Sequence, residues 1–177
     1  MLRLAGIAPA EMRGVGIDEA PHKNELPRAH ALRLAREKAS AAAKAAPLRF
    51  VLAADTVVAC GRRILPKAAD KNEVAACLEL LSGRRHQVHT GVALILPDGH
   101  LRTRLISTRV TFRRLTPREI AAYSASGEGE GKAGGYAIQG GAAAFASAIN
   151  GSYTNVVGLP LAETLSLLAG GGFPIDR

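Results

Sequence analysis

The chain has 177 residues, 47% of them hydrophobic, with four Phe, three Tyr, no Trp and a formal net charge of +8. This length suits a single domain with a core of aliphatic side chains. No apolar run approaches the roughly 20 residues that a membrane helix needs, and the first residues lack the pattern of a signal peptide. Cys60 and Cys77 fit neither a disulfide framework nor a zinc spacing. We therefore expect free thiols in a reducing compartment and a cytoplasmic protein.

The positive charge favours an anionic partner, although a basic surface without any partner would give the same composition. The arginines are scattered along the chain, for example Arg36, Arg63, Arg85 and Arg114, and few aromatic residues lie between them. Nucleic-acid surfaces more often show a basic stripe with stacking aromatics. Small anionic substrates are therefore the better prediction, and nucleic acid ranks last.

The first 45 residues predict a short helical end, a loop and one strong helix. Residues 1–7 are typical of a helix end with Gly6 as its C-cap, and residues 9–27 have the composition of a loop. Residues 28–45 are rich in Ala and Arg and predict an amphipathic helix. Lys38 on this helix is either a solvated lysine, the commoner case, or a group that points into a neighbouring cleft.

The segment from Phe50 to Lys67 organises the chain. It opens with five apolar residues and then places a carboxylate, Asp55, directly before a hydroxyl, Thr56. Such a run predicts a buried strand. An unpartnered carboxylate deep in a strand would be costly. We therefore expect Asp55 near a strand end, facing a cleft that holds a metal, a cation or a substrate. The alternative is an Asp that caps a following turn.

Further along the chain, local signals predict a helix, a hairpin and a second helix. Asp70 and Asn72 can start a helix that runs to Ser82-Gly83. Strands are expected over residues 87–96 and 101–114, because an Asp-Gly turn separates two alternating apolar runs. Thr116-Pro117-Arg118-Glu119 forms a capping-box sequence and predicts a helix to about Ser124.

The last part of the chain is dense in glycine and then apolar. Residues 126–141 are either a disordered linker or an ordered loop whose backbone approaches a ligand. The return of apolar residues favours the ordered loop. Residues 153–160 predict a short strand and turn, and Pro160 opens a helix to Leu168. Residues 170–177 are expected to trail off without regular structure.

Seven stretches of this sequence together resemble the Maf family of nucleoside triphosphate pyrophosphatases. They are Asp18-Glu19, Arg36-Glu37-Lys38-Ala39, AADTVV at 53–58, ILPKAAD at 64–70, LSGRRHQVHTGV at 81–92, SGEGEGKAGGYAIQG at 126–140 and GSYTNVVGLPLAE at 151–163. The resemblance implies one Maf-like domain over residues 1–177 of the α/β class. It implies a mixed, partly antiparallel sheet flanked by helices, similar to inosine triphosphate pyrophosphatases, with a cleft between two lobes.

The resemblance also implies a reaction, the hydrolysis of a nucleoside triphosphate to the monophosphate and pyrophosphate. The Tyr-Ala-Ile-Gln-Gly sequence at 136–140 is similar to the dTTP/UTP type, which could remove non-standard nucleotides from the pool. A divalent metal, Mg²⁺ or Mn²⁺, is implied as cofactor. The implied roles are general base or metal organisation for Asp55, a second metal carboxylate for Glu19, contacts to phosphate for Lys38 and Lys67, and substrate binding for Thr56, Lys132 and Gln139.

Members of the family open with a strand and a Ser-x-Ser-Pro-Arg-Arg loop that these 177 residues do not contain. The sequence therefore predicts reduced or absent activity, together with exposed sheet backbone and apolar surface. The alternative function is a catalytically impaired nucleotide-binding or regulatory protein linked to septum formation. A homodimer is also compatible with the resemblance.

Overall fold

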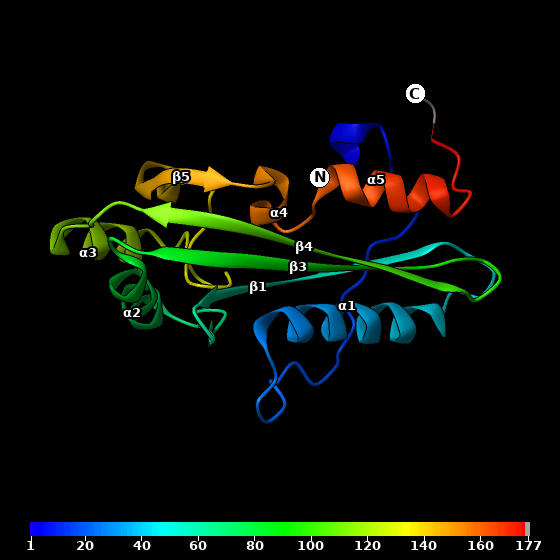
Figure 1. The fold of residues 1–177 in the computed structure, drawn as a ribbon, viewed down its shortest axis with the longest axis horizontal. Helices are drawn as coiled ribbons and strands as arrows, with labels where there is room; N and C mark the ends of the chain where they lie inside the picture. Colours follow the sequence, from blue (N-terminus) through cyan, green and yellow to red (C-terminus); the bar gives the residue numbers. More distant parts are fainter. Residues whose placement is uncertain (176–177) are drawn as a thin grey trace.

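A five-stranded sheet forms the centre of the computed structural model, which describes residues 1–175 (Figure 1). The strands lie in the order β2-β1-β3-β4-β5. Their bounds are Val51–Cys60 (β1), Arg63–Leu65 (β2), Arg85–Ile95 (β3), Leu101–Phe112 (β4) and Ala146–Asn150 (β5). All four pairings are antiparallel. The α/β class is confirmed. The expectation of a mixed sheet is corrected, because every strand pairing within residues 1–175 is antiparallel.

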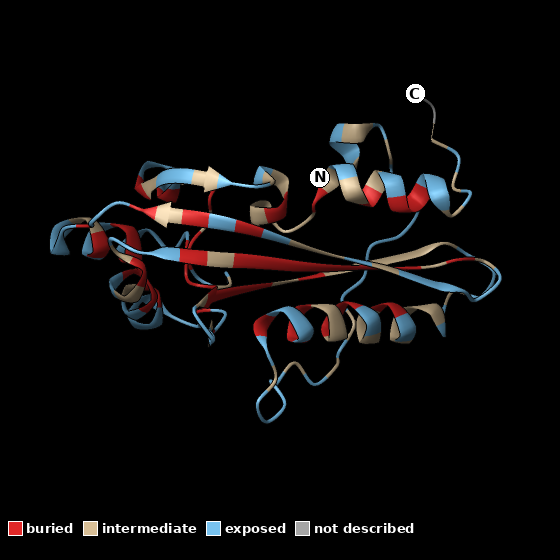
Figure 2. Ribbon diagram, viewed as in Figure 1, coloured by how far each residue is buried: buried red, intermediate tan, exposed pale blue. Residues whose placement is uncertain are grey.

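Helices lie on both sides of this sheet (Figure 1). Their bounds are Leu2–Ala5 (η1), Pro27–Ala43 (α1), Lys71–Leu81 (α2), Pro117–Ser126 (α3), Gly141–Phe145 (η2), Tyr153–Val157 (α4) and Leu161–Gly170 (α5). No helix within residues 1–175 combines the length and apolar character that crossing a membrane requires. Buried residues follow the central strands and the sides of α1 and α5 that face them (Figure 2).

The register of β1 and β3 determines which residues face α1. Asp55 pairs with Gly91, and directly paired residues of neighbouring strands share one face of a sheet. A Cβ atom at Gly91 would lie 2.4 Å from the carbonyl oxygen of Ala31 in α1. The absent side chain therefore allows the helix backbone to lie directly on the strand. Asp55 consequently points toward α1, whereas Thr56 points to the opposite face.

The opposite face of the sheet carries most of the apolar core. One buried cluster joins Val58, Val88 and Val110 to side chains of α2 and α3. A second cluster joins Val92 and Leu94 to α5. Under α1 the buried apolar contacts come from alanines, so the helix packs close to the strands.

Several local predictions are confirmed. Gly6 is the C-cap of η1 in the left-handed conformation, and the Asp70 side chain caps α2 by accepting from the backbone of Asn72 and Glu73. Thr116 and Glu119 form the capping box of α3. Strands β3 and β4 form the expected hairpin, with Gly99 at a φ of 86° in its turn.

Two predictions about strands are wrong. Asp55 is the fifth of the ten residues of β1 and so lies in the middle of the strand. Residues 153–157 form helix α4, and the strand expected there is formed earlier, at β5. The Ser152 side chain caps α4, and the buried Asn155 amide donates to the Val88 carbonyl and the Thr108 hydroxyl. These tertiary contacts outweigh the strand preference of Val156 and Val157. Of the tail at 170–177, residues 176–177 lie outside the described residues.

Candidate active site

The site is centred on an ion pair between β1 and α1. The Lys38 ammonium donates a hydrogen bond to the Asp55 carboxylate. Only 5% of the Asp55 side chain and 18% of the Lys38 side chain are exposed. This partner resolves the problem of a carboxylate in the middle of a buried strand, because the charge is paired where it is desolvated. Lys38 therefore points toward the site, as the cleft interpretation predicted.

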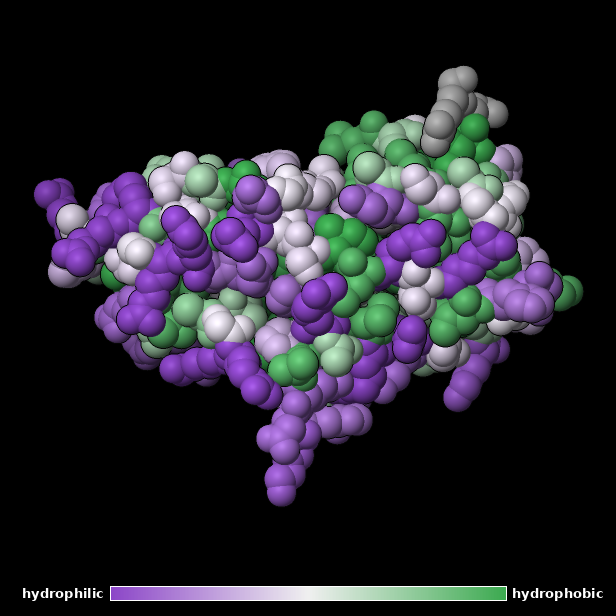
Figure 3. Space-filling model, in the orientation of Figure 1, coloured by the Kyte–Doolittle hydropathy of each residue, from purple (hydrophilic) through white to green (hydrophobic). Residues whose placement is uncertain are grey.

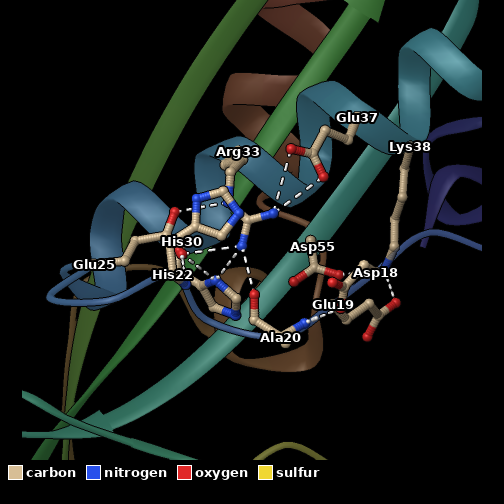
Figure 4. Close-up of polar contacts among 10 residues, drawn as sticks. All are labelled: Asp18, Glu19, Ala20, His22, Glu25, His30, Arg33, Glu37, Lys38 and Asp55. Atoms are coloured by element: carbon tan, nitrogen blue, oxygen red, sulfur yellow. Dashed lines mark hydrogen bonds and ion pairs between the residues drawn. The ribbon is translucent and has the colours of Figure 1, made fainter.

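A second carboxylate and a second lysine complete the cluster. Glu19 lies in the segment before α1, and its carboxylate is 2.6 Å from the Lys38 ammonium. It also accepts a hydrogen bond of 2.5 Å from Lys67, which follows β2. The four charged groups of the cluster, Glu19, Lys38, Asp55 and Lys67, thus come from four separate parts of the chain and alternate in sign. Figure 4 shows Glu19 and Asp55 with Lys38 reaching toward them from α1.

The two lysines determine the protonation state of Glu19. Hydrogen bonds from Lys38 and then Lys67 lower the pKa of Glu19 to about 2. Burial acts to lower the pKa of Lys38, but its hydrogen bonds to Asp55 and Glu19 outweigh this and raise it. Glu19 is therefore an anion and Lys38 a cation at neutral pH.

A cavity of about 1100 Å³ opens beside the cluster, with Glu19 and Lys38 in its wall. Its other walls come from residues 7–15, from β1 residues 51–54 and from apolar side chains that include Leu159 and Phe173. In Figure 3 hydrophobic residues gather over the part of the molecule formed by η1 and α5. The cavity thus combines a charged wall with apolar walls, as small-molecule sites commonly do.

One of the three expected substrate-binding residues lies on a segment whose backbone pairs with that of the Lys67 segment. Lys132 lies on the glycine-rich segment, residues 126–141. The backbone of this segment pairs with the residues around Lys67. The Ala68 N–H donates to the Lys132 carbonyl at 3.2 Å, and the Gly134 N–H donates to the Pro66 carbonyl at 2.9 Å. The glycine-rich segment is accordingly an ordered loop, not a linker. A Cβ at Gly134 would lie 2.8 Å from Val58, which explains the glycine there.

The other two residues lie elsewhere. Thr56 is on the opposite face of β1 from Asp55, where its hydroxyl is 2.9 Å from that of Thr90. Gln139 is exposed in a turn before η2. No contact within residues 1–175 links the Gln139 side chain to the cluster, so its role in reading the base stays a prediction.

The sequence analysis missed the residues that hold the Glu19 segment. Arg33 and Glu25 form a bidentate ion pair with distances of 2.8 and 3.0 Å, and Arg33 also donates to the carbonyl of Ala20 at 2.9 Å. Eight residues separate Arg33 from Glu25, and no helical or strand period links them. Their pairing depends on the course of the loop, which gave no signal in the sequence.

Comparison with known proteins identifies the family. The chain matches the family described as Maf-like protein over residues 1–170. This chain belongs to the Maf family. A protein of Nitrobacter hamburgensis named dTTP/UTP pyrophosphatase is 58% identical over 181 residues, which covers 99% of this chain and 87% of that protein. A protein of Paramagnetospirillum magneticum with the same name is 58% identical, covering 98% of this chain and 91% of that protein.

The cluster contains two carboxylates, those of Glu19 and Asp55. Within residues 1–175 no group of three or more His, Cys, Asp or Glu side chains lies in position to hold a metal by itself. Mg²⁺ usually retains several waters and binds one or two carboxylates together with substrate phosphates. Glu19 and Asp55, which share Lys38 as a partner, have the chemistry for such a shared site.

Proposed function

We propose that this Maf protein hydrolyses nucleoside triphosphates, dTTP and UTP in particular, to the monophosphate and pyrophosphate. The observation that carries the proposal is the cluster of Glu19, Lys38, Asp55 and Lys67 in and beside the wall of a cavity large enough for a nucleotide. The relatives at 58% identity that are named dTTP/UTP pyrophosphatases support this choice of substrate.

The chemistry of the reaction matches the charges of the cluster. A water must lose a proton and attack a phosphorus atom that negative oxygens surround. We propose that Asp55 accepts this proton, because its fixed position in β1 can hold a water in one orientation. Lys38 and Lys67 then neutralise the charge that develops on the pyrophosphate leaving group. Lys38 can turn from Glu19 to the substrate without losing Asp55 as a partner.

A divalent cation, Mg²⁺ or Mn²⁺, would be held by Glu19 and Asp55 together with the phosphates. When bound it supplies charge neutralisation and orients the triphosphate. Glu19 is 38% exposed, against 5% for Asp55. We therefore propose Glu19 as the carboxylate that is accessible to a hydrated ion.

Substrate contacts from Lys132 and Gln139 belong to the same proposal. Lys132 is exposed on the loop beside Lys67, where it can contact a phosphate. A Gln amide both donates and accepts, which suits the edge of thymine or uracil. Thr56 lies on the face of β1 opposite to Asp55, so it would contact the nucleobase of the substrate from that face. A cytoplasmic location is proposed as well, and the free thiols of Cys60 and Cys77 agree with it.

The test is pyrophosphate release from dTTP, UTP and 7-methyl-GTP with Mg²⁺, measured beside the Nitrobacter hamburgensis relative as a positive control. We expect turnover of dTTP and UTP, and its loss in Asp55→Asn with the circular dichroism spectrum unchanged. Unchanged turnover in Asp55→Asn would remove Asp55 from the mechanism. Nucleotide binding without turnover in the wild-type chain would favour the binding or regulatory alternative.

A further inference from the structure

The segment that carries Glu19 has little else to hold it in place. Residues 8–26 form no helix or strand, and most of them are exposed. Loops with few buried apolar contacts open easily. The position of Glu19 against Lys38 and Lys67 must therefore depend on the polar contacts between this segment and α1.

Arg33 makes most of these contacts. Its guanidinium donates two hydrogen bonds to the Glu25 carboxylate and one to the carbonyl of Ala20, the residue directly after Glu19. A further nitrogen reaches Glu37, one turn along α1, at 3.1 Å. Figure 4 shows the Arg33 guanidinium among Glu25, Ala20 and Glu37. The planar fork of the guanidinium directs several donors in fixed directions, so it can hold the Glu25 carboxylate and the Ala20 carbonyl at once.

Three residues contact the Glu25 carboxylate, and Arg33 is one of them. The carboxylate also accepts from the backbone N–H of His22 at 3.0 Å and contacts Nδ1 of the buried His30 at 2.9 Å. The Arg33 hydrogen bonds lower the pKa of Glu25 to about 2, so it is an anion that can only accept. Nδ1 of His30 also lies 3.1 Å from a guanidinium nitrogen of Arg33, so the three side chains are in mutual contact. The Arg33–Glu25–His30 clamp thus closes residues 20–25 onto the first turns of α1.

We propose that Arg33 is a positioning residue that, through this clamp, holds Glu19 between Lys38 and Lys67. Arg33 fixes the backbone beside Glu19, and Lys38, five residues later on the same helix, binds the Glu19 side chain. One rigid helix thereby sets both the course of the loop and the place of its carboxylate. The catalytic consequence rests on the proposed function of Glu19, whereas the positioning itself does not.

The positioning is tested first by hydrogen–deuterium exchange on the whole chain. Arg33→Met keeps the length of the side chain and removes its donors. Arg36→Met is the matched control, because Arg36 is exposed on the same helix. We expect faster exchange at residues 18–26 in Arg33→Met, with β1 and β3 unchanged, and wild-type exchange in Arg36→Met. Glu25→Gln, which preserves volume, provides a second variant should Arg33→Met fold poorly. Wild-type protection of residues 18–26 in both variants would overturn the proposal.

Kinetics then separate positioning from a general loss of structure. Arg33→Met should lower kcat/KM about tenfold or more, and the double variant with Glu19→Gln should be no slower than Glu19→Gln alone. Additive losses would mean that Arg33 does not act through Glu19. A wild-type chain without pyrophosphatase activity would refute the proposed function, while the exchange experiment would still decide the positioning.

Discussion

Removing the Lys38 ammonium should destabilise the fold more than removing the Asp55 charge. Within residues 1–175, Lys38 supplies the one hydrogen bond that the Asp55 carboxylate accepts, and Asp55 is 5% exposed. In Lys38→Met the carboxylate is left buried and unpaired, which costs about 3–5 kcal/mol in comparable cases. Asp55→Asn leaves Lys38 with Glu19 as a partner and removes the buried anion, so about 1–2 kcal/mol is expected. At this chain length Lys38→Met should lower Tm by roughly 8–15 °C.

The assay is urea unfolding followed by circular dichroism at pH 7, without nucleotide. Adding Asp55→Asn to Lys38→Met should recover most of the loss. Lys44→Met, exposed at the end of α1, is the control and should stay within about 0.5 kcal/mol of wild type. A Lys38→Met loss below about 1 kcal/mol, or one that Asp55→Asn does not relieve, would refute this reasoning.

Two further predictions concern the core. Burial lowers the pKa of His86, whose ring contacts the Tyr136 hydroxyl at 2.8 Å, to about 4. The unfolded chain therefore binds the extra proton first, and about 3 kcal/mol of stability should be lost as the pH falls from 6.5 to 4. Urea unfolding should show that His86→Phe loses less stability than the wild type between pH 6.5 and 4. The same dependence of stability on pH in both proteins would contradict the prediction. Gly91→Ala places a Cβ 2.4 Å from the Ala31 carbonyl oxygen. It should cost about 1–3 kcal/mol and reduce turnover by displacing α1, whereas Gly16→Ala, which meets open space, should match wild type in both assays.

Local signals in the sequence determined much of the secondary structure. The caps at Asp70 and Thr116 and the turn at Gly99 are where the sequence predicts them. Each depends on side chains and backbone within a few residues of one another, so one stretch of sequence contains the whole interaction. The resemblance of the motifs to the Maf family was likewise sufficient to select the residues that meet in the cluster.

Contacts between distant segments decided the rest. Asp55 is in mid-strand because Lys38 of α1 reaches it, and the cost of burying its charge could not be assessed without that partner. Residues 153–157 are helical because Ser152 and Asn155 find partners that include distant Thr108. The Arg33–Glu25 pair forms only when the loop folds back on α1. A charge or amide is stable in a protein interior only with its partner present, and the tertiary structure alone supplies that partner.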